Sequence, residues 1–421
     1  MVIETYYVIL MAMAVGFGLF MTWGIGANDV ANAMGTSVGS GAITVRQAII
    51  IAAIFEFAGA FLAGGHVTKT IRKGIIDPTS IVDTPEILVF GMLASLLAAA
   101  IWLMVASTKG WPVSTTHTIV GAVVGFACVG IGVDAVMWDK IGQIVASWVV
   151  SPALGGFIAY MLMMSIRWLI LEQDDPFKMA QRWGPIYVFL VGFIISLVTM
   201  FKGLKHLDLD LSVQMSFAVA ISFGALCAMV GWFLIQRVER DLEAEKTFRF
   251  AGVEKVFTPM MIFTACAMAF AHGSNDVANG IGPMAAVISI LENGDVAQES
   301  ALPIWILFLG GGGIVLGLAT LGYRVMQTIG TDITHLTPSR GFCATLAAAA
   351  TVVLASRTGL PVSTTHVAVG AVIGVGLARG IGALDLRVIG TIAVSWFITL
   401  PIGAALSAIF FWTLKGAMGM S

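Results

Sequence analysis

The sequence predicts an all-α polytopic membrane protein with about twelve transmembrane helices arranged as an inverted repeat. Three observations support this prediction. Charged residues make up 11% of the 421 residues, whereas a soluble domain has about 25%. Hydrophobic residues make up 58% and gather in long stretches. Two polar motifs each occur twice along the chain, in the same order.

The composition excludes several classes of protein. A water-soluble surface needs roughly a quarter to a third of its residues to be charged, so the chain is neither a soluble enzyme nor a disordered chain. The net charge of −2 gives no reason to expect a polyanionic partner, and a nucleic-acid-binding protein is excluded as well. The partner expected for its surface is the lipid bilayer.

Twelve apolar stretches are candidates for the membrane-spanning helices. In chain order they are Tyr6–Ile25, Ala48–Gly65, Ile87–Ala106, Thr118–Val133, Ile141–Ile166, Ile186–Phe201, Val213–Ile235, Val256–Ala271, Pro303–Tyr323, Phe342–Ala355, Val367–Leu377 and Val388–Leu414. The first has no basic flank and leads straight into a polar block, so we expect an uncleaved helix rather than a signal peptide. Several are shorter than a full span, and short segments in matching positions of two halves are typical of a transporter's binding site.

One charged connector interrupts the apolar pattern. The segment Gln236–Lys255 holds five basic and five acidic residues. The positive-inside rule counts the basic residues and largely ignores the acids, so this connector is expected on the cytoplasmic side of the cell membrane.

The internal repeat consists of three blocks. GANDVANAMG at Gly26–Gly35 returns as GSNDVANGIG at Gly273–Gly282, and PVSTTH at Pro112–His117 returns at Pro361–His366. IGQIVASW, which begins at residue 141, returns as IGTIAVSW from residue 389. We therefore expect a first repeat over residues 1–164, an inter-repeat region over 165–255 and a second repeat over 256–421. From the residues the repeat could be parallel or inverted. A basic residue, Arg46, follows the first Gly26–Gly35 block, and three acidic residues (Glu292, Asp295 and Glu299) follow its copy, which favours the inverted arrangement.

The PVSTTH blocks have the composition of an anion site. Pro112 ends any preceding helix, and the hydroxyl residues then lie where a new helix begins. A helix N-terminus offers free N–H groups and a partial positive charge, and each hydroxyl adds a rotatable donor. Two such helix ends with six hydroxyls would suit a tetrahedral oxyanion; ordinary helix capping is the alternative. The six residues are Ser114, Thr115, Thr116, Ser363, Thr364 and Thr365.

The NDVAN blocks have the composition of a cation site. An aspartate at membrane depth is costly and marks a functional site by default. The asparagines lie four residues apart and share one helix face, so the blocks offer carboxylate and amide oxygens, together with backbone carbonyls freed near the flanking glycines. Oxygen ligands suit a hard cation. The candidate ligands are Asn28, Asp29, Asn32, Asn275, Asp276 and Asn279.

The two motifs depend on one another physically. A bare carboxylate beside a bound anion would repel it strongly in a low-dielectric interior. A cation or a proton is therefore required between them, which predicts cation-coupled uptake of an anion. Sodium fits the oxygen ligands, and proton coupling is the alternative, with His117 and His366 as candidate carriers. Glu56, which has no counterpart in Pro303–Tyr323, is a third candidate for coupling.

These duplicated motifs closely resemble the signatures of the PiT family of inorganic phosphate transporters, in the compact form found in prokaryotes. The resemblance implies a twelve-helix inverted-repeat fold with two helical hairpins meeting near the middle of the membrane, and a homodimer. It implies phosphate bound by the six hydroxyl residues and sodium bound by the Asn and Asp residues of the NDVAN blocks. No other cofactor is expected.

The resulting prediction is a secondary active transporter that imports inorganic phosphate across the cytoplasmic membrane by sodium-coupled symport. Proton-coupled phosphate symport and sulfate symport by the same architecture stay open. An intramembrane enzyme is disfavoured, because an active site seldom needs every element twice and Ser114 and His117 lack an evident orienting partner. A channel is disfavoured by the pairing of an anion site with carboxylates.

Overall fold

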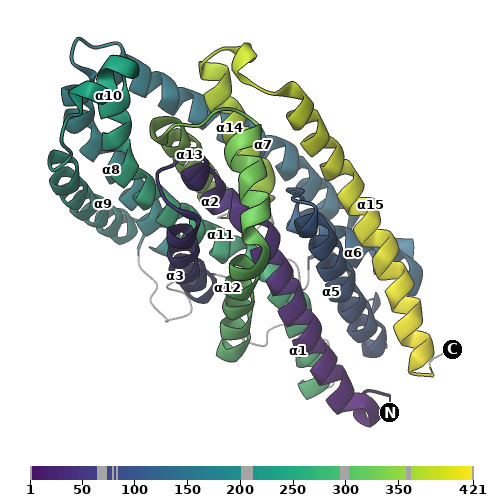
Figure 1. Cartoon of the computed structure of the whole chain (residues 1–421). Helices are drawn as coiled ribbons and strands as arrows, with labels where there is room; N and C mark the ends of the chain where they lie inside the picture. Colours follow the sequence, from purple (N-terminus) through teal and green to yellow (C-terminus); the bar gives the residue numbers. More distant parts are fainter. Residues whose placement is uncertain are drawn as a thin grey trace.

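A computed structural model describes residues 2–63, 74–77, 80–81, 84–200, 212–293, 303–356 and 362–419. Throughout these residues the chain is helical, apart from short connections and one isolated bridge between Ile76 and Val136 (Figure 1). The main helices are α1 (Val2–Asn28), α2 (Val30–Gly39), α3 (Val45–Ala63), α5 (Pro85–Thr108), α6 (Thr115–Gly130), α7 (Trp138–Ile166), α8 (Pro176–Val198), α9 (Val213–Gln236), α10 (Leu242–Thr247), α11 (Ala251–Asn293), α12 (Ile304–Gln327), α13 (Pro338–Ser356), α14 (Thr364–Ala378) and α15 (Leu386–Ala417). Short helical turns complete the fold: η2 (Val133–Ala135), η3 (Arg167–Leu171), η6 (Thr328–Asp332) and η7 (Ile381–Ala383).

The predicted all-helical membrane fold is confirmed. Among the described residues, ten helical segments are long and apolar enough to cross a membrane, and α6 and α14 are two shorter apolar helices. Each of the twelve predicted stretches lies on a helix of this set, although the ends of the second and sixth stretches fall outside the described residues. The two short helices are those that begin at the PVSTTH blocks.

Two predicted helix boundaries were wrong. Helix α8 begins at Pro176 rather than Ile186. Its first turns contain polar residues such as Lys178 and Gln181, so the apolar stretch does not include them. Helix α11 was expected to end near Ala271, but it continues to Asn293. The polar residues of the second NDVAN block lie inside this helix and face the protein interior, so they do not interrupt it.

Helices of one repeat pack between helices of the other repeat. Helix α1 packs on α12 and α5, and its counterpart α11 packs on α3 and α13. In the same way α6 packs on α15, and α14 packs on α7. Helix α2 corresponds to the later part of α11 in the repeated sequence, and each of the contacts between repeats named here has a counterpart in the other repeat. Residues 165–200 and 212–255, with the pair α8 and α9, lie between the two sets of helices in the sequence.

Glycines of the NDVAN blocks allow these close crossings. A Cβ atom added to Gly26 would lie 1.9 Å from the backbone oxygen of Ile314 on α12, and one added to Gly273 would lie 2.2 Å from that of Glu56 on α3. Small residues at such crossings let helix backbones approach each other. Helix α11 is continuous through its block, but Pro283 inside it has no N–H to donate to the Asn279 carbonyl, and α1 and α2 are separated at Asp29.

Helices α1 and α11 run in opposite directions in the view of Figure 1. In Figure 1, α1 starts at the N-terminus at the bottom of the view and rises, whereas α11 begins next to α10 at the top and descends. Of the charged residues used to argue for inversion, Asp295 and Glu299 lie outside the described residues.

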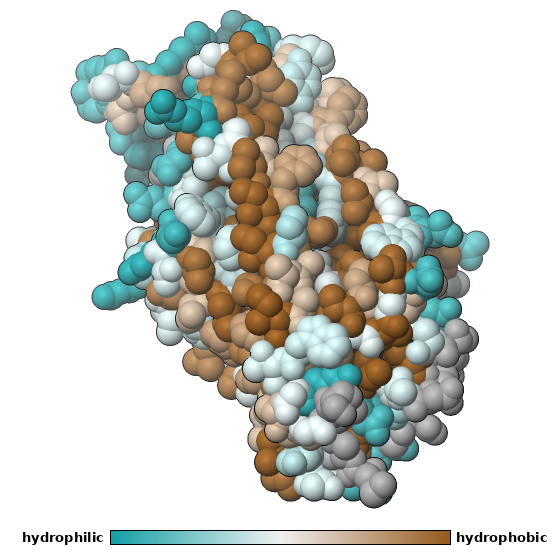
Figure 2. All heavy atoms as spheres, turned by 90° about the vertical axis from the view of Figure 1, so that its right-hand side faces the viewer, coloured by the Kyte–Doolittle hydropathy of each residue, from teal (hydrophilic) through white to brown (hydrophobic). Residues whose placement is uncertain are grey.

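The outer surface is apolar around the middle of the molecule. Figure 2 shows hydrophobic side chains across the centre of the face that contains α15, with hydrophilic residues gathered at the upper end. On α15, Phe397 is 82% exposed and Trp412 is 53% exposed. Such exposure of large apolar side chains is expected of a surface covered by lipid. The polar residues of the two motifs are instead buried in the interior of the protein.

Candidate ion-binding site

The PVSTTH blocks form the starts of two short helices. Helices α6 and α14 begin at Thr115 and Thr364, directly after the serines of the blocks. The Ser114 hydroxyl accepts a hydrogen bond from the His117 backbone N–H at 3.2 Å, and the Ser363 hydroxyl accepts one from the His366 N–H at 3.2 Å. The two serines are thus the helix caps that satisfy the first free N–H groups. Pro112 lies in an irregular segment before α6, as predicted, whereas Pro361 lies outside the described residues.

The threonines bring the two motifs together. The Thr115 hydroxyl donates a hydrogen bond to Asp29 Oδ2 at 2.5 Å, and the Thr364 hydroxyl donates to Asp276 Oδ2 at 2.7 Å. The Thr365 hydroxyl lies 3.2 Å from Asp29 Oδ1, so Asp29 contacts the starts of both short helices. Both aspartates are buried.

Asn32 and Asn279 each form hydrogen bonds with threonines of the other repeat. The Asn32 side-chain amide donates to the Thr365 hydroxyl at 3.0 Å, and the Asn279 amide donates to the hydroxyls of Thr115 and Thr116 at 3.2 Å each. Neither contact joins residues of the same repeat. The site is therefore complete only when both repeats are folded against each other.

The two remaining asparagines hold the segments that precede α6 and α14. The Asn28 amide donates to the Trp111 carbonyl at 3.0 Å, and Asn28 Oδ1 accepts from the Val113 N–H at 3.2 Å. The Asn275 amide donates to the Val362 carbonyl at 3.1 Å and to Asp276 Oδ1 at 2.8 Å. These contacts fix the approach of the irregular segments to the helices that carry the aspartates.

Three side-chain oxygens of this cluster have no hydrogen-bond partner among the described residues. They are the amide oxygens of Asn32, Asn275 and Asn279, and all three atoms are buried. Buried polar atoms are rarely left unpaired, and an amide oxygen can only accept. Unpaired acceptors beside two buried carboxylates are the donor set that a hard cation requires.

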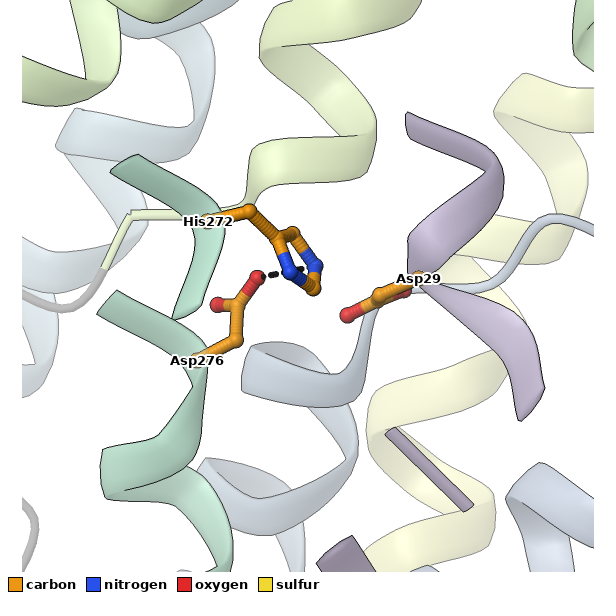
Figure 3. A group of neighbouring side chains, drawn as sticks. All are labelled: Asp29, His272 and Asp276. Atoms are coloured by element: carbon orange, nitrogen blue, oxygen red, sulfur yellow. Dashed lines mark ion pairs between the residues drawn. The ribbon is translucent and has the colours of Figure 1, made fainter. Parts of the chain in front are cut away.

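His272 is a site residue that the sequence analysis missed. Its Nε2 atom lies 2.8 Å from Asp276 Oδ2, and its Nδ1 atom lies 3.0 Å from Glu56 Oε2. Figure 3 shows the side chains of Asp29, His272 and Asp276 pointing toward one another, and their ligand atoms all lie within 4.8 Å of one another. The signal in the sequence is its position directly before the second NDVAN block.

This contact occurs in only one of the two repeats. The residue before the first block is Ile25, and the α12 residue that meets Gly26 is Ile314. The α3 residue that meets Gly273 is Glu56, so the pair of Glu56 and His272 takes the place of an isoleucine pair. Glu56, proposed from the sequence as a coupling residue, is therefore joined to Asp276 through His272.

His117 and His366 contact tryptophans through their Nδ1 atoms and ring faces. His117 Nδ1 lies 3.4 Å from the Trp396 carbonyl oxygen, and His366 Nδ1 lies 3.1 Å from that of Trp148. Each imidazole stacks on a tryptophan with ring centres 3.6 Å apart, and the two imidazoles meet edge to face at 4.3 Å. They tie α6 to α15 and α14 to α7. The structure does not bring either ring to the carboxylates.

A buried polar site built from both halves of a polytopic helical membrane protein, with carboxylates and amide oxygens beside two helix starts, is typical of a membrane transporter. Comparison with known proteins identifies the family. Residues 25–407 match the phosphate transporter family, and the chain belongs to it.

Known proteins resemble the chain over most of its length. A protein of Haemophilus influenzae described as a phosphate permease is 53% identical over 400 residues, covering 95% of each chain. Inorganic phosphate transporter 2-1 of Arabidopsis thaliana, a chloroplastic protein, is 43% identical over 425 residues, covering 94% of this chain and 70% of that protein. A solved structure titled "The sodium-dependent phosphate transporter" superposes with a TM-score of 0.89 at 41% identity, covering 96% of this chain and 99% of its own.

These likenesses confirm the resemblance stated from the motifs. The family is one of transporters, so the chain is a transporter and not an enzyme. Phosphate is the transported substrate that the family shares. The apolar helices and the family together make it a multi-pass membrane protein.

Proposed function

We propose that the protein imports inorganic phosphate by sodium-coupled symport with alternating access. The observation that carries the proposal is the set of unpaired amide oxygens beside Asp29 and Asp276, because these atoms call for a cation and not for an anion. The similarity to a structure titled as a sodium-dependent phosphate transporter supports the choice of sodium.

Sodium would bind among the oxygens of the NDVAN blocks. Asp29 and Asp276 supply negative charge, and Asn32, Asn275 and Asn279 supply the unpaired oxygens. The side-chain oxygen of Asn28 already accepts a hydrogen bond from the Val113 N–H. Its proposed role is therefore to hold the segment before α6 beside the sodium ligands.

Phosphate would bind at the starts of α6 and α14. The free N–H groups and partial positive charge of two helix N-termini favour an oxyanion. Thr115, Thr116, Thr364 and Thr365 would donate from their hydroxyls, with Ser114 and Ser363 holding the helix starts in shape. The aspartates lie within hydrogen-bond distance of these threonines, so the anion needs the cation to offset their charge.

Proton coupling is a second candidate, and one observation favours it. Glu56, His272 and Asp276 form a continuous buried row of titratable groups that ends at the proposed ion site. The histidines of the PVSTTH blocks, His117 and His366, are the weaker carriers because their Nδ1 atoms face backbone carbonyls of tryptophans.

We further propose that the three segments 1–164, 165–255 and 256–421 are the first repeat, the inter-repeat region and the second repeat of an inverted-repeat fold. The opposed directions of α1 and α11 support this arrangement. The family resemblance supports a homodimer in the cytoplasmic membrane, and the basic residues of 236–255 support a cytoplasmic position for the connector.

Uptake of radiolabelled phosphate by proteoliposomes tests the coupling. An inward sodium gradient at equal pH on both sides is expected to drive uptake, and replacing sodium with potassium is expected to abolish it. Uptake driven by an inward proton gradient without sodium would favour the second candidate. Competition by excess unlabelled sulfate measures anion choice, and loss of uptake at equimolar sulfate would contradict phosphate as the preferred anion.

A further inference from the structure

The protons of the four threonine hydroxyls in the proposed phosphate site are directed at other groups of the protein. A threonine hydroxyl carries one proton and so donates one hydrogen bond at a time. Thr115 donates to Asp29 and Thr364 donates to Asp276. Thr116 donates to the Val362 carbonyl, and Thr365 is within 3.2 Å of both the Val113 carbonyl and Asp29 Oδ1. None of the four hydroxyls has a proton left for an anion in this arrangement.

The oxygen atoms of the two key hydroxyls are held in place by the opposite repeat. Thr115 Oγ1 accepts from the Asn279 amide at 3.2 Å, and Thr364 Oγ1 accepts from the Asn32 amide at 3.5 Å. Rotation about the Cβ–Oγ bond therefore redirects the proton without moving the oxygen. The partner that the proton leaves is a carboxylate, and a cation bound to that carboxylate would replace the lost hydrogen bond.

We propose that Thr115 and Thr364 are the coupling residues of the transport reaction: each hydroxyl donates to its aspartate when no cation is bound and turns to the phosphate when sodium occupies that carboxylate. This inference rests on the proposed function and adds the link between the two ions. The unpaired oxygens of Asn32 and Asn279 mark where the cation would arrive, on the same residues that hold the hydroxyls. The arrangement occurs once in each repeat.

The inference predicts a specific thermodynamic signature. Coupling between two ligands is a single free energy, so sodium strengthens phosphate binding by the same factor by which phosphate strengthens sodium binding. In the Thr115→Val and Thr364→Val double variant, the carboxylates have no hydroxyl to release. The factor by which saturating sodium tightens phosphate binding is expected to fall by about tenfold, within the usual range of coupling factors. Sodium binding without phosphate is expected to keep or exceed its wild-type affinity.

Binding of radiolabelled phosphate to the purified full chain, with and without saturating sodium, measures this factor, and calorimetric titration with sodium measures the cation affinity. The Thr115→Ser and Thr364→Ser double variant keeps both hydroxyls and is expected to restore the coupling. Thr118→Val is the matched control, because the Thr118 hydroxyl donates to the Ser114 carbonyl at 2.8 Å on the same helix and meets no carboxylate. Its coupling factor is expected to equal that of the wild type.

Three outcomes would overturn the inference. The first is a valine variant that binds phosphate more weakly by the same factor with and without sodium, since the hydroxyls would then be plain phosphate ligands. The second is a valine variant that loses sodium affinity in the absence of phosphate, since the hydroxyls would then be plain cation ligands. The third is failure of the serine variant to restore coupling. A wild-type protein whose phosphate binding ignores sodium would instead contradict the proposed function, whatever the variants do.

Discussion

Glu56 and His272 lie at a helix crossing that has a counterpart in the other repeat, but the counterpart has different side chains. Each crossing between a long helix and its partner brings a glycine against a backbone oxygen, at Gly26 with Ile314 and at Gly273 with Glu56. One crossing is lined by isoleucine and the other by a buried pair of a carboxylate and an imidazole, 3.0 Å apart. The duplicated motifs therefore have the same Asn, Asp and Thr residues, but the neighbouring helix crossings differ in their side chains.

This asymmetry gives a prediction about stability. Removing one partner of a buried pair leaves the other uncompensated and costs about 3–5 kcal/mol. We therefore expect His272→Ile to destabilise the protein by about that amount, because Glu56 stays buried without its partner. The double variant with Glu56→Ile as well reproduces the pair of Ile25 and Ile314, and much of the lost stability should return. Thermal unfolding in detergent, analysed as a double-mutant cycle, measures the coupling; additive effects of the two changes would contradict the prediction.

At the scale of the element, glycines decide how closely helices cross. A Cβ atom on Gly317 of α12 would lie 1.8 Å from the Trp23 backbone oxygen of α1, whereas one on Gly312 of the same helix meets nothing within 4 Å. Overpacking a tight contact forces the backbone apart and costs about 1–3 kcal/mol. Alanine at an open helical position instead gains up to about 1 kcal/mol over glycine.

We predict opposite effects of the two alanine substitutions on α12. Gly317→Ala is expected to lower the unfolding temperature and to reduce phosphate uptake, because Asp29 directly follows the end of α1. Gly312→Ala is expected to leave the unfolding temperature unchanged or to raise it. Unfolding of both variants in the same detergent is the measurement. Equal effects of the two substitutions would show that the α1–α12 crossing does not depend on the missing side chain.

The connector between the repeats contains the short helix α10, whose stability is predicted to depend on pH. Asp241 Oδ1 caps α10 by accepting from the Ala244 N–H at 2.9 Å, and Oδ2 accepts from Lys255 Nζ at 2.7 Å. The hydrogen bond from Lys255, together with that from the backbone N–H, lowers the pKa of Asp241. A lowered folded-state pKa stabilises the fold above the unfolded value, about 3.9, and this contribution is lost as the pH falls through the folded value.

Asp241→Asn isolates the ion pair, because asparagine caps a helix as well as aspartate does. At pH 7 the variant is expected to show faster amide hydrogen exchange in α10 than the wild type. Once the pH has fallen through the lowered pKa of Asp241, the carboxylate is protonated and the two proteins should exchange alike. Glu243→Gln is the control, since the pair of Glu243 and Lys246 is exposed and contributes little. A difference between Asp241→Asn and the wild type that persists after Asp241 has been protonated would exclude the ion pair as its cause.

At the scale of the whole molecule, neither repeat contains a complete site. Asn32 and Asn279 each donate to threonines of the other repeat, and α6 and α14 pack on helices of the other repeat. The two halves must therefore fold together. The connector around residues 237–241 joins them and is the natural point of division.

We predict that two fragments divided at this connector are inactive alone and active together. Co-expression of residues 1–238 and 239–421 is expected to give a complex with sodium-dependent phosphate uptake in proteoliposomes, at a lower yield than the intact chain. Either fragment by itself should give none. Uptake by a single fragment would contradict a site shared between the repeats.

Much of the site was predictable from the sequence because its residues occur in short motifs that are repeated. Local rules were sufficient to locate the helix starts at Thr115 and Thr364 and to pair the aspartates with the threonines as one site. They failed after Ala271, where the apolar stretch ends but α11 continues through the second NDVAN block to Asn293. A helix tolerates Asn and Asp when neighbouring helices satisfy their side chains, and no local pattern reports those neighbours.

Composition and spacing by themselves determined that the chain spans a membrane with about twelve helices, that it is duplicated, and that its few deep charges mark the candidate site. These properties depend on hydrophobicity and helix geometry, which act over a few turns. Only the tertiary structure decided that His272 and Glu56 join Asp276 in one repeat alone, that His117 and His366 face tryptophan carbonyls, and that each threonine meets its partners across the repeat boundary. Those contacts join residues far apart in sequence, and they exist because helices of opposite repeats cross at glycines, closely enough for side chains to meet.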